Sequence, residues 1–273
     1  MTAVNSYRIE QENRDVAGEL ERLRRQATLS WQQEARLLRW IGLADGMCLL
    51  ELGCGPGYVT EQLAADWPGL SITALDHAAD LLAQAVERLG SSRVTWVQDS
   101  AESTSLAPAQ FDFVLARYLF QHLPDPAAVA REAYRLLRPG GCLAVIDIDD
   151  GFWGAAQPSY PQLPAIYAKA GVAQAERGGD RFIGRKLYRL LQSAGFQAVE
   201  LEAFVYHSDA LGMEPFLPQL SPDRLLVAVR SGAISPREFA LAQALFHHFL
   251  AAPDAFVLMA GLLAHGHKPH DAA

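Results

Sequence analysis

The chain has 273 residues, of which 50% are hydrophobic, and a formal net charge of −8 at pH 7. This length and composition can bury a sizeable core, which excludes an intrinsically disordered protein and fits one α/β domain with a cap. The acidic balance offers no basic field for phosphates, so we expect neither nucleic acid nor a membrane as a partner. Because no segment has the apolar pattern of a signal peptide or a membrane span, the expected location is the cytoplasm.

Two amphipathic helices are predicted at the N-terminus, over residues 8–27 and 31–42. Ser30 and Gln33 form a capping-box pattern at the start of the second helix. We expect residues 1–42 to form a helical cap or lid over the rest of the chain. The same helices could instead pack on a second subunit, so a homo-oligomer remains possible.

Short apolar runs then alternate with amphipathic segments, which is typical of βαβ units whose parallel sheet is covered by helices on both faces. Asp125 and Pro126 supply an N-cap and a first-turn proline for one of these helices. The predicted strands span 47–52, 71–76, 93–98, 111–116 and 142–148, and the predicted helices span 57–66, 79–89 and 126–137.

The second half of the chain is less regular. One α/β core is expected over residues 43–273, with cap insertions at about 151–180 and 208–252. The signals behind it are a stretch with Gly and Pro over 151–179, a helix over 181–193, strands over 197–206 and 255–264, and helices opened by Ser221-Pro222 and Ser235-Pro236.

The cysteines and histidines do not have the spacing of a metal site. The cysteines fall in or beside apolar runs and are predicted to be small core residues, and no metal ion is expected. These residues are Cys48, Cys54 and Cys142, with the histidine pair at 247–248 and the C-terminal His265, His267 and His270.

A glycine-rich turn follows the first predicted strand and opens a helix, in the segment Leu49–Gly57. Glycines allow positive φ and close approach of the backbone to a ligand, and a helix N-terminus offers free amides. This loop therefore predicts a site for a nucleoside-bearing cofactor. A dinucleotide fingerprint would place its third glycine at position 58, which is Tyr58, so an NAD-dependent dehydrogenase is disfavoured.

The glycines at 53, 55 and 57, with an acid two places before the first, resemble motif I of class I S-adenosylmethionine-dependent methyltransferases. The segments Phe111–Arg117 and Leu136–Gly141 are similar to the family's fourth strand and its turn into the fifth. The resemblance is to the ubiquinone and menaquinone-biosynthesis type and to natural-product methyltransferases. It implies a Rossmann-like fold with a seven-stranded, mostly parallel sheet whose last strand is antiparallel, and S-adenosylmethionine as cofactor.

The same resemblance implies roles for individual residues. Asp76 would accept hydrogen bonds from the ribose hydroxyls, although it could merely cap the next helix, and Asp99 would meet the adenine amino group unless it is a simple loop acid. Glu51 would engage the methionine ammonium, usually through water. The full set of expected cofactor residues is Glu51, Gly53, Gly55, Gly57, Asp76, His77, Asp99, Ser100, Ala101 and Arg117.

The acceptor site is expected at the carboxyl ends of the fourth and fifth strands. His122 is the leading candidate for a general base, with packing beside the cofactor as the alternative. Arg181 and Arg185, four apart on one predicted helix face, could hold an anionic group, although exposure to solvent is the favoured explanation. The residues expected to contact substrate are Tyr7, Tyr118, Asp149 and Trp153.

The sequence thus predicts methyl transfer from S-adenosylmethionine to a small, hydrophobic or aromatic organic acceptor in secondary-metabolite biosynthesis. Aromatic residues gather in the expected cap, which favours such an acceptor. The acceptor atom and the need for a base are left open. The alternative is a fold relative that binds the cofactor but catalyses a non-methylating reaction such as cyclisation or decarboxylation.

Overall fold

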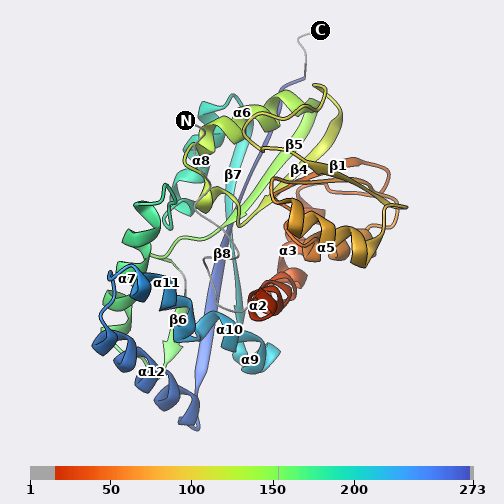
Figure 1. The fold of residues 1–273 in the computed structure, drawn as a ribbon. Helices are drawn as coiled ribbons and strands as arrows, with labels where there is room; N and C mark the ends of the chain where they lie inside the picture. The colour runs from red at the N-terminus through yellow and green to blue at the C-terminus, as the bar shows by residue number, and fades with distance from the viewer. Residues whose placement is uncertain (1–15, 153, 271–273) are drawn as a thin grey trace.

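One eight-stranded sheet forms the centre of the fold (Figure 1). The computed structural model describes residues 16–152 and 154–270. The strand order is β3-β2-β1-β4-β5-β8-β6, and β7 pairs with β8. The strands are β1 Cys48–Leu52, β2 Ser71–Asp76, β3 Val94–Gln98, β4 Phe111–Arg117, β5 Leu137–Asp147, β6 Gly154–Gln157, β7 Gln197–His207 and β8 Phe256–His267.

Strands β1 to β5 are parallel, and β8 runs antiparallel to its partners β5, β6 and β7. The predicted Rossmann-like sheet with an antiparallel last strand is therefore confirmed. Strand β6, which has no counterpart among the predicted strands, adds to it by pairing with residues 256–259 of β8.

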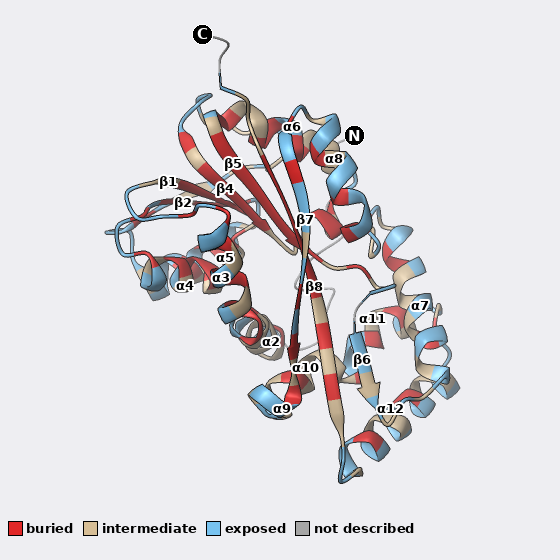
Figure 2. Cartoon of the chain, turned by 180° about the vertical axis from the view of Figure 1, so that it is seen from behind, coloured by how far each residue is buried: buried red, intermediate tan, exposed pale blue. Residues whose placement is uncertain are grey.

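Helices cover both faces of the parallel strands because side chains alternate along each strand. In β4, Phe113 and Leu115 pack in the cluster that includes α3 and α4, whereas Val114 and Ala116 pack in the cluster that includes α6 and α8. Figure 2 shows β4 and β5 buried along most of their length. The helices around the parallel strands are α2 Val16–Leu29, α3 Trp31–Trp40, α4 Tyr58–Asp66, α5 Ala79–Leu89, α6 Pro126–Leu136 and α8 Leu187–Ser193.

The remaining helices gather around the far part of β8 and around β6 (Figure 1). Helices α7, α11 and α12 contribute to a third, smaller apolar cluster. These helices are α7 Gln162–Ala175, α9 Ser208–Leu211, α10 Leu217–Leu220, α11 Leu226–Arg230 and α12 Pro236–Ala251, and the short 3₁₀ turns are η1 Phe120–His122, η2 Gly184–Lys186, η3 Glu214–Phe216 and η4 Pro222–Leu225. Across the described residues, no helix is both long and apolar enough to cross a bilayer.

Two local predictions are wrong. Ser30 does not cap α3, because its hydroxyl donates to the carboxylate of Glu34 rather than accepting from the backbone. Helix α8 begins at Leu187, so Arg181 and Arg185 do not lie on one helix face. The Asp125 cap is confirmed, since its carboxylate accepts from the Ala128 amide at 3.0 Å.

Candidate cofactor and acceptor site

A cavity of about 1130 Å³ opens at the carboxyl ends of β1, β2, β4 and β5. Helix α2, helix α7, η4 and the middle of β8 close its other sides. The volume exceeds the roughly 300–1,000 Å³ of common ligand pockets, so the cavity has room for two ligands side by side. The acceptor site was predicted at the carboxyl ends of the strands, and the cavity lies there.

The glycine loop forms one end of this cavity. The backbone φ values of Gly53, Gly55 and Gly57 are 72°, 53° and 73°, in the left-handed region that favours glycine. The Gly53 and Cys54 amides donate to the Leu75 carbonyl, which fastens the loop to the end of β2.

Gly55 is the loop glycine that offers space to a ligand. A Cβ added at Gly55 would meet no atom within 4 Å, and Gly55 lines the cavity. A Cβ at Gly57 would lie 3.0 Å from Ala85 and 3.1 Å from Trp96. Gly57 does not line the cavity, so its role here is to let α4 pack against its neighbours.

Asp76 ends β2 beside the loop and is buried. One carboxylate oxygen accepts from the Gly55 amide at 2.8 Å and the other from the Ala78 amide at 2.9 Å. Asp76 lines the cavity, and its two carboxylate oxygens are acceptors of the kind to which a vicinal diol donates. His77 also lines the cavity, with its Nδ1 atom 3.2 Å from the Asp76 carboxylate.

Glu51 lies on β1 below the loop, buried but lining the cavity. Burial raises the pKa of its carboxyl to about 7, against the opposing effects of the Thr60 hydrogen bond and the Arg117 charge. The Thr60 hydroxyl donates to it at 2.6 Å. The group therefore changes charge near neutral pH and can bind a cation that enters the cavity.

Arg117 ends β4 and forms a buried ion pair with Glu34 of α3. Its Nε and Nη2 atoms donate to the two carboxylate oxygens at 2.6 and 2.9 Å, and Nη2 also donates to the Gln26 carbonyl of α2 at 2.9 Å. The side chains of Arg117 and Glu34 are 6% and 0% exposed. The guanidinium thus joins both N-terminal helices to the sheet, and α2 borders the cavity at this point.

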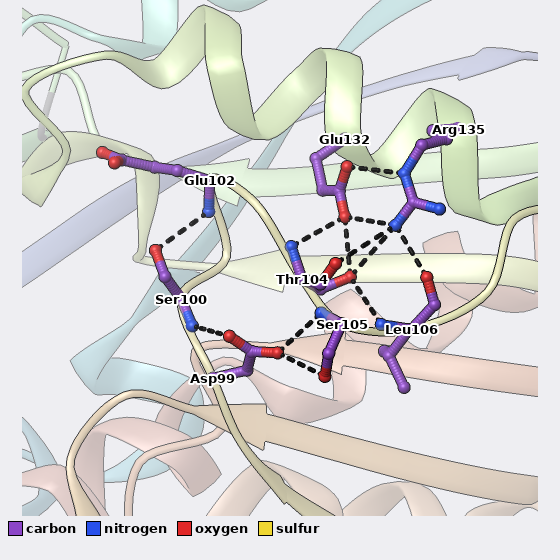
Figure 3. A network of polar contacts seen from close by, with 8 residues as sticks. All are labelled: Asp99, Ser100, Glu102, Thr104, Ser105, Leu106, Glu132 and Arg135. Atoms are coloured by element: carbon purple, nitrogen blue, oxygen red, sulfur yellow. Dashed lines mark hydrogen bonds and ion pairs between the residues drawn. The ribbon is translucent and has the colours of Figure 1, made fainter.

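Asp99 follows β3, and its carboxylate is turned to its own loop (Figure 3). It accepts from the Ser100 amide at 2.8 Å, the Ser105 amide at 2.7 Å and the Ser105 hydroxyl at 2.8 Å. The Ser105 bonds hold the pKa of Asp99 below its usual range. Asp99, Ser100 and Ala101 do not line the cavity, so their expected adenine contact stays a prediction.

Tyr118 follows Arg117 with a φ of 53°, a strained value for a side chain with a Cβ. Burial raises the pKa of its phenol well above the usual range. The ring lies under the Arg117 guanidinium at 4.5 Å and, like Tyr206, lines the cavity. The other two predicted substrate contacts from aromatic residues, Tyr7 and Trp153, fall outside the described residues.

His122 lies in the cavity wall at the end of η1. Burial lowers the pKa of its imidazole to about 3, and the positive charges of Arg181, Arg22 and Arg177 add to this effect. Its Nδ1 atom lies 3.4 Å from the amide nitrogen of Gln174. The imidazole is therefore neutral at pH 7 and a weak base in the ligand-free protein.

The two acids after β5, Asp149 and Asp150, form ion pairs with Arg185 and Arg181, the arginines that were predicted to share a helix face. Asp149 is held by Arg185, whose Nε and Nη2 atoms both donate to its carboxylate at 2.6 Å. Although burial opposes it, Arg185 keeps the pKa of Asp149 below its usual range. Asp150 accepts from Arg181 Nη2 at 2.8 Å. Asp149 and Arg181 both line the cavity.

Residues 50–145 match a family model described as a methyltransferase domain. Residues 50–145 therefore form a methyltransferase domain. The matched segment runs from β1 through β5 and includes the glycine loop, Asp76 and Arg117.

Curated relatives of this methyltransferase domain include two trans-aconitate 2-methyltransferases. The Azoarcus sp. (strain BH72) protein is 38% identical over 110 residues, which are 40% of this chain and 42% of that protein. The Methylobacterium radiotolerans protein is 29% identical over 209 residues, 69% of this chain and 77% of that protein. With the Azoarcus protein, the match thus spans less than half of the relative's length.

A solved structure with the same fold is Haemonchus contortus phosphoethanolamine N-methyltransferase 2, in complex with phosphomonomethylethanolamine and S-adenosylhomocysteine. Its TM-score is 0.57 at 22% identity, covering 88% of this chain and 52% of that one. The likeness confirms the Rossmann-like methyltransferase fold.

The cofactor of the methyltransferase domain is S-adenosylmethionine, and the residues at the loop end of the cavity fit it. The open space at Gly55 and the two-oxygen acceptor of Asp76 suit a nucleoside, while Glu51 suits a cationic amino group. The predicted cofactor residues that line the cavity are Glu51, Gly53, Gly55, Asp76, His77 and Arg117.

Cofactor binding should depend on pH through Glu51. If the methionine ammonium contacts this carboxylate, binding favours the ionised form, so affinity should rise from about pH 6 to about pH 8 and then level off. Calorimetric titration with S-adenosylmethionine across this pH range measures the change in affinity. Glu51→Gln should weaken binding and abolish the slope, whereas the exposed Glu87→Gln should change neither; a slope that survives in Glu51→Gln would assign it to another group.

Three basic residues that line the cavity could not be predicted from the sequence. Arg22 lies on α2, Arg177 just after α7 and Arg224 on η4, and all three line the cavity with Arg181. They are far apart in the sequence and show no shared motif. Of the three, only Arg224 lies close to a recognised signal, which is the helix start predicted at Ser221-Pro222.

Proposed function

We propose that the protein transfers the methyl group of S-adenosylmethionine to a small organic acceptor that carries an anionic group. The observation that supports this most is the set of four arginines that line the cavity, Arg22, Arg177, Arg181 and Arg224. Arg22 and Arg181 are paired with Glu19 and Asp150, so the positive charge is only partly compensated. A cofactor at the loop would leave these arginines for the acceptor.

The electrostatics of these arginines favour an anion. Arg224 has exposed surface but lies within the walls of the cavity, and this enclosure together with the charges of Arg181 and Arg22 lowers its pKa to about 10. The same arginines depress the pKa of His122. A bound carboxylate or phosphate would offset this mutual repulsion and form charge-assisted hydrogen bonds with the guanidinium groups.

Apolar and aromatic side chains also line the cavity, which suits an acceptor with an apolar or aromatic body. They include Tyr118, Tyr167, Tyr206, Phe246 and Phe249. Two relatives are named for trans-aconitate, a polycarboxylate, and this also favours a negatively charged acceptor here. A role in secondary metabolism remains part of the proposal.

The cofactor, when bound, supplies an electrophilic methyl group on a positively charged sulfur. The chain's part is to align the acceptor atom with it and to exclude water. An ionised acceptor needs no base, and the neutral, weakly basic His122 agrees with a positioning role for its ring.

The test is S-adenosylhomocysteine formation with a panel of carboxylic acids and phenolic acids, each paired with its uncharged amide. Turnover with the acids and not with the amides is expected. Equal turnover with both would refute the anionic group while leaving methyl transfer intact. Tight cofactor binding with no S-adenosylhomocysteine from any compound would favour a non-methylating reaction.

Replacing Arg224 should impair acceptor binding selectively. Arg224→Gln removes one charge-assisted bond, so the KM for an anionic acceptor should rise about 10- to 100-fold. Cofactor affinity should stay the same, because the glycine loop is untouched. The control is Arg230→Gln on α11, an exposed arginine outside the cavity wall; a similar KM change in both variants would indicate a non-specific charge effect.

His122→Gln should leave most of the activity. If the acceptor is already ionised, kcat should fall less than about tenfold, well below the range of up to about 10⁴-fold for loss of a general base. The pH profile of kcat should also keep its shape between wild type and variant. A larger fall in kcat with loss of an inflection in the profile would make His122 the base.

A further inference from the structure

A cysteine and two histidines meet on the sheet outside the cavity wall. Cys142 of β5 is the direct cross-strand partner of His267 on β8, and Ala144 is the partner of His265. Since side chains two residues apart on a strand share a face, His265 and His267 project to the same side as Cys142. Antiparallel pairing thus joins residues whose sequence spacing predicted no metal site.

The three side chains are close enough to share one ion. Their ligand atoms all lie within 4.8 Å of one another. Around a tetrahedral Zn²⁺, with Zn–S of about 2.3 Å and Zn–N of about 2.0 Å, neighbouring ligand atoms are about 3.3–3.6 Å apart. Small rotations of the side chains bridge this difference.

Of the three residues, His265 gives the strongest indication that a metal ion binds here. It is 6% exposed, and neither of its ring nitrogens has a hydrogen-bond partner. A buried, unpaired polar group is destabilising by about 1–3 kcal/mol, so native proteins normally satisfy it.

The surroundings offer a fourth donor. Glu200 of β7 is the cross-strand partner of His265, and its carboxylate lies 3.6 Å from His265 Nε2. The Trp40 ring packs edge-on against His265, with the ring centroids 5.9 Å apart. Cys142 is buried among apolar residues, whereas the Glu200 side chain is 57% exposed, so an ion here would have one protected side and one side open to water.

We propose that Cys142, His265 and His267 bind one Zn²⁺, with Glu200 or water as the fourth ligand. One thiolate with two imidazoles is a donor set that Zn²⁺ accepts readily. Metal binding would release the thiol proton of Cys142. None of the four residues lines the cavity, so the ion links β5, β8 and β7 and takes no part in methyl transfer.

The first experiment uses the full chain stripped with a chelator. Titration with Zn²⁺ should show one ion per chain and a higher melting temperature, and Co²⁺ should give a thiolate-to-metal charge-transfer absorption. Affinity for S-adenosylhomocysteine should not change. Absence of a stoichiometric ion in both titrations would overturn the proposal.

The variants show which residues hold the ion. Cys142→Ser should remove the Co²⁺–thiolate absorption, and His265→Gln should weaken Zn²⁺ binding at least about tenfold. Matched controls are Cys48→Ser and the exposed His247→Gln, which should bind as the wild type does. S-adenosylhomocysteine titration of each variant confirms that it is folded. Metal binding that persists in folded Cys142→Ser and His265→Gln, or is lost in the controls, would refute this site.

Discussion

Asp76→Ala should reduce the affinity for S-adenosylmethionine by about 100-fold or more. The change removes two carboxylate acceptors for ribose hydroxyls, and hydrogen bonds to charged groups contribute about 1.5–3 kcal/mol each. The loop should also loosen, because the carboxylate accepts from the Gly55 and Ala78 amides. Calorimetric titration with the cofactor measures the loss.

Asp76→Asn separates the two causes. Its amide oxygen can still accept one of the backbone bonds, so the variant should be more stable than Asp76→Ala while binding the cofactor poorly. Asp209→Ala, an exposed acid on α9, is the control and should bind normally. A cofactor affinity within about threefold of wild type in Asp76→Ala would contradict the ribose contact.

Arg117→Met should lower the free energy of unfolding by about 3–5 kcal/mol. The reason is that Glu34, 0% exposed, would remain as a buried carboxylate without its cation. Chemical denaturation followed by circular dichroism measures the change. Helix α2 should lose its anchor as well, since Arg117 also donates to the Gln26 carbonyl.

The double variant tests this explanation. Arg117→Met combined with Glu34→Gln removes the stranded charge and should recover much of the stability, giving a strongly non-additive cycle. Arg24→Met, which breaks an exposed ion pair on α2, should have a far smaller effect. Additive losses in the double variant would show that the ion pair itself is not the cause.

The parallel half of the fold could be predicted because its local signals agree with its tertiary structure. The runs 47–52 and 71–76 are short and mainly apolar, as buried parallel strands are, and both are strands in the structure with boundaries within one residue of the prediction. Helix α7 was missed because Pro164 and Gly171 lie within it, and β6 is short and low in β-branched residues.

The candidate site likewise has one part that could be predicted from the sequence and one that could not. The loop end was predictable because a ligand that contacts the backbone requires glycines at fixed spacing, and Gly53 and Gly55 face the cavity. The acceptor end depends on side chains from α2, α7 and η4, which come together only through packing. Neither the contacts of Arg224 nor the pairing of Asp149 with Arg185 has any local signal in the sequence.

Strand β8 has a consequence for how products leave. Its residues 262–267 are hydrogen-bonded to β5, while Met259 and Ala260 form part of the cavity wall. That wall therefore belongs to a hydrogen-bonded ladder and cannot swing outward without breaking it. We expect the exit route to pass instead beside α2, whose residues 18–26 border the cavity from outside the sheet.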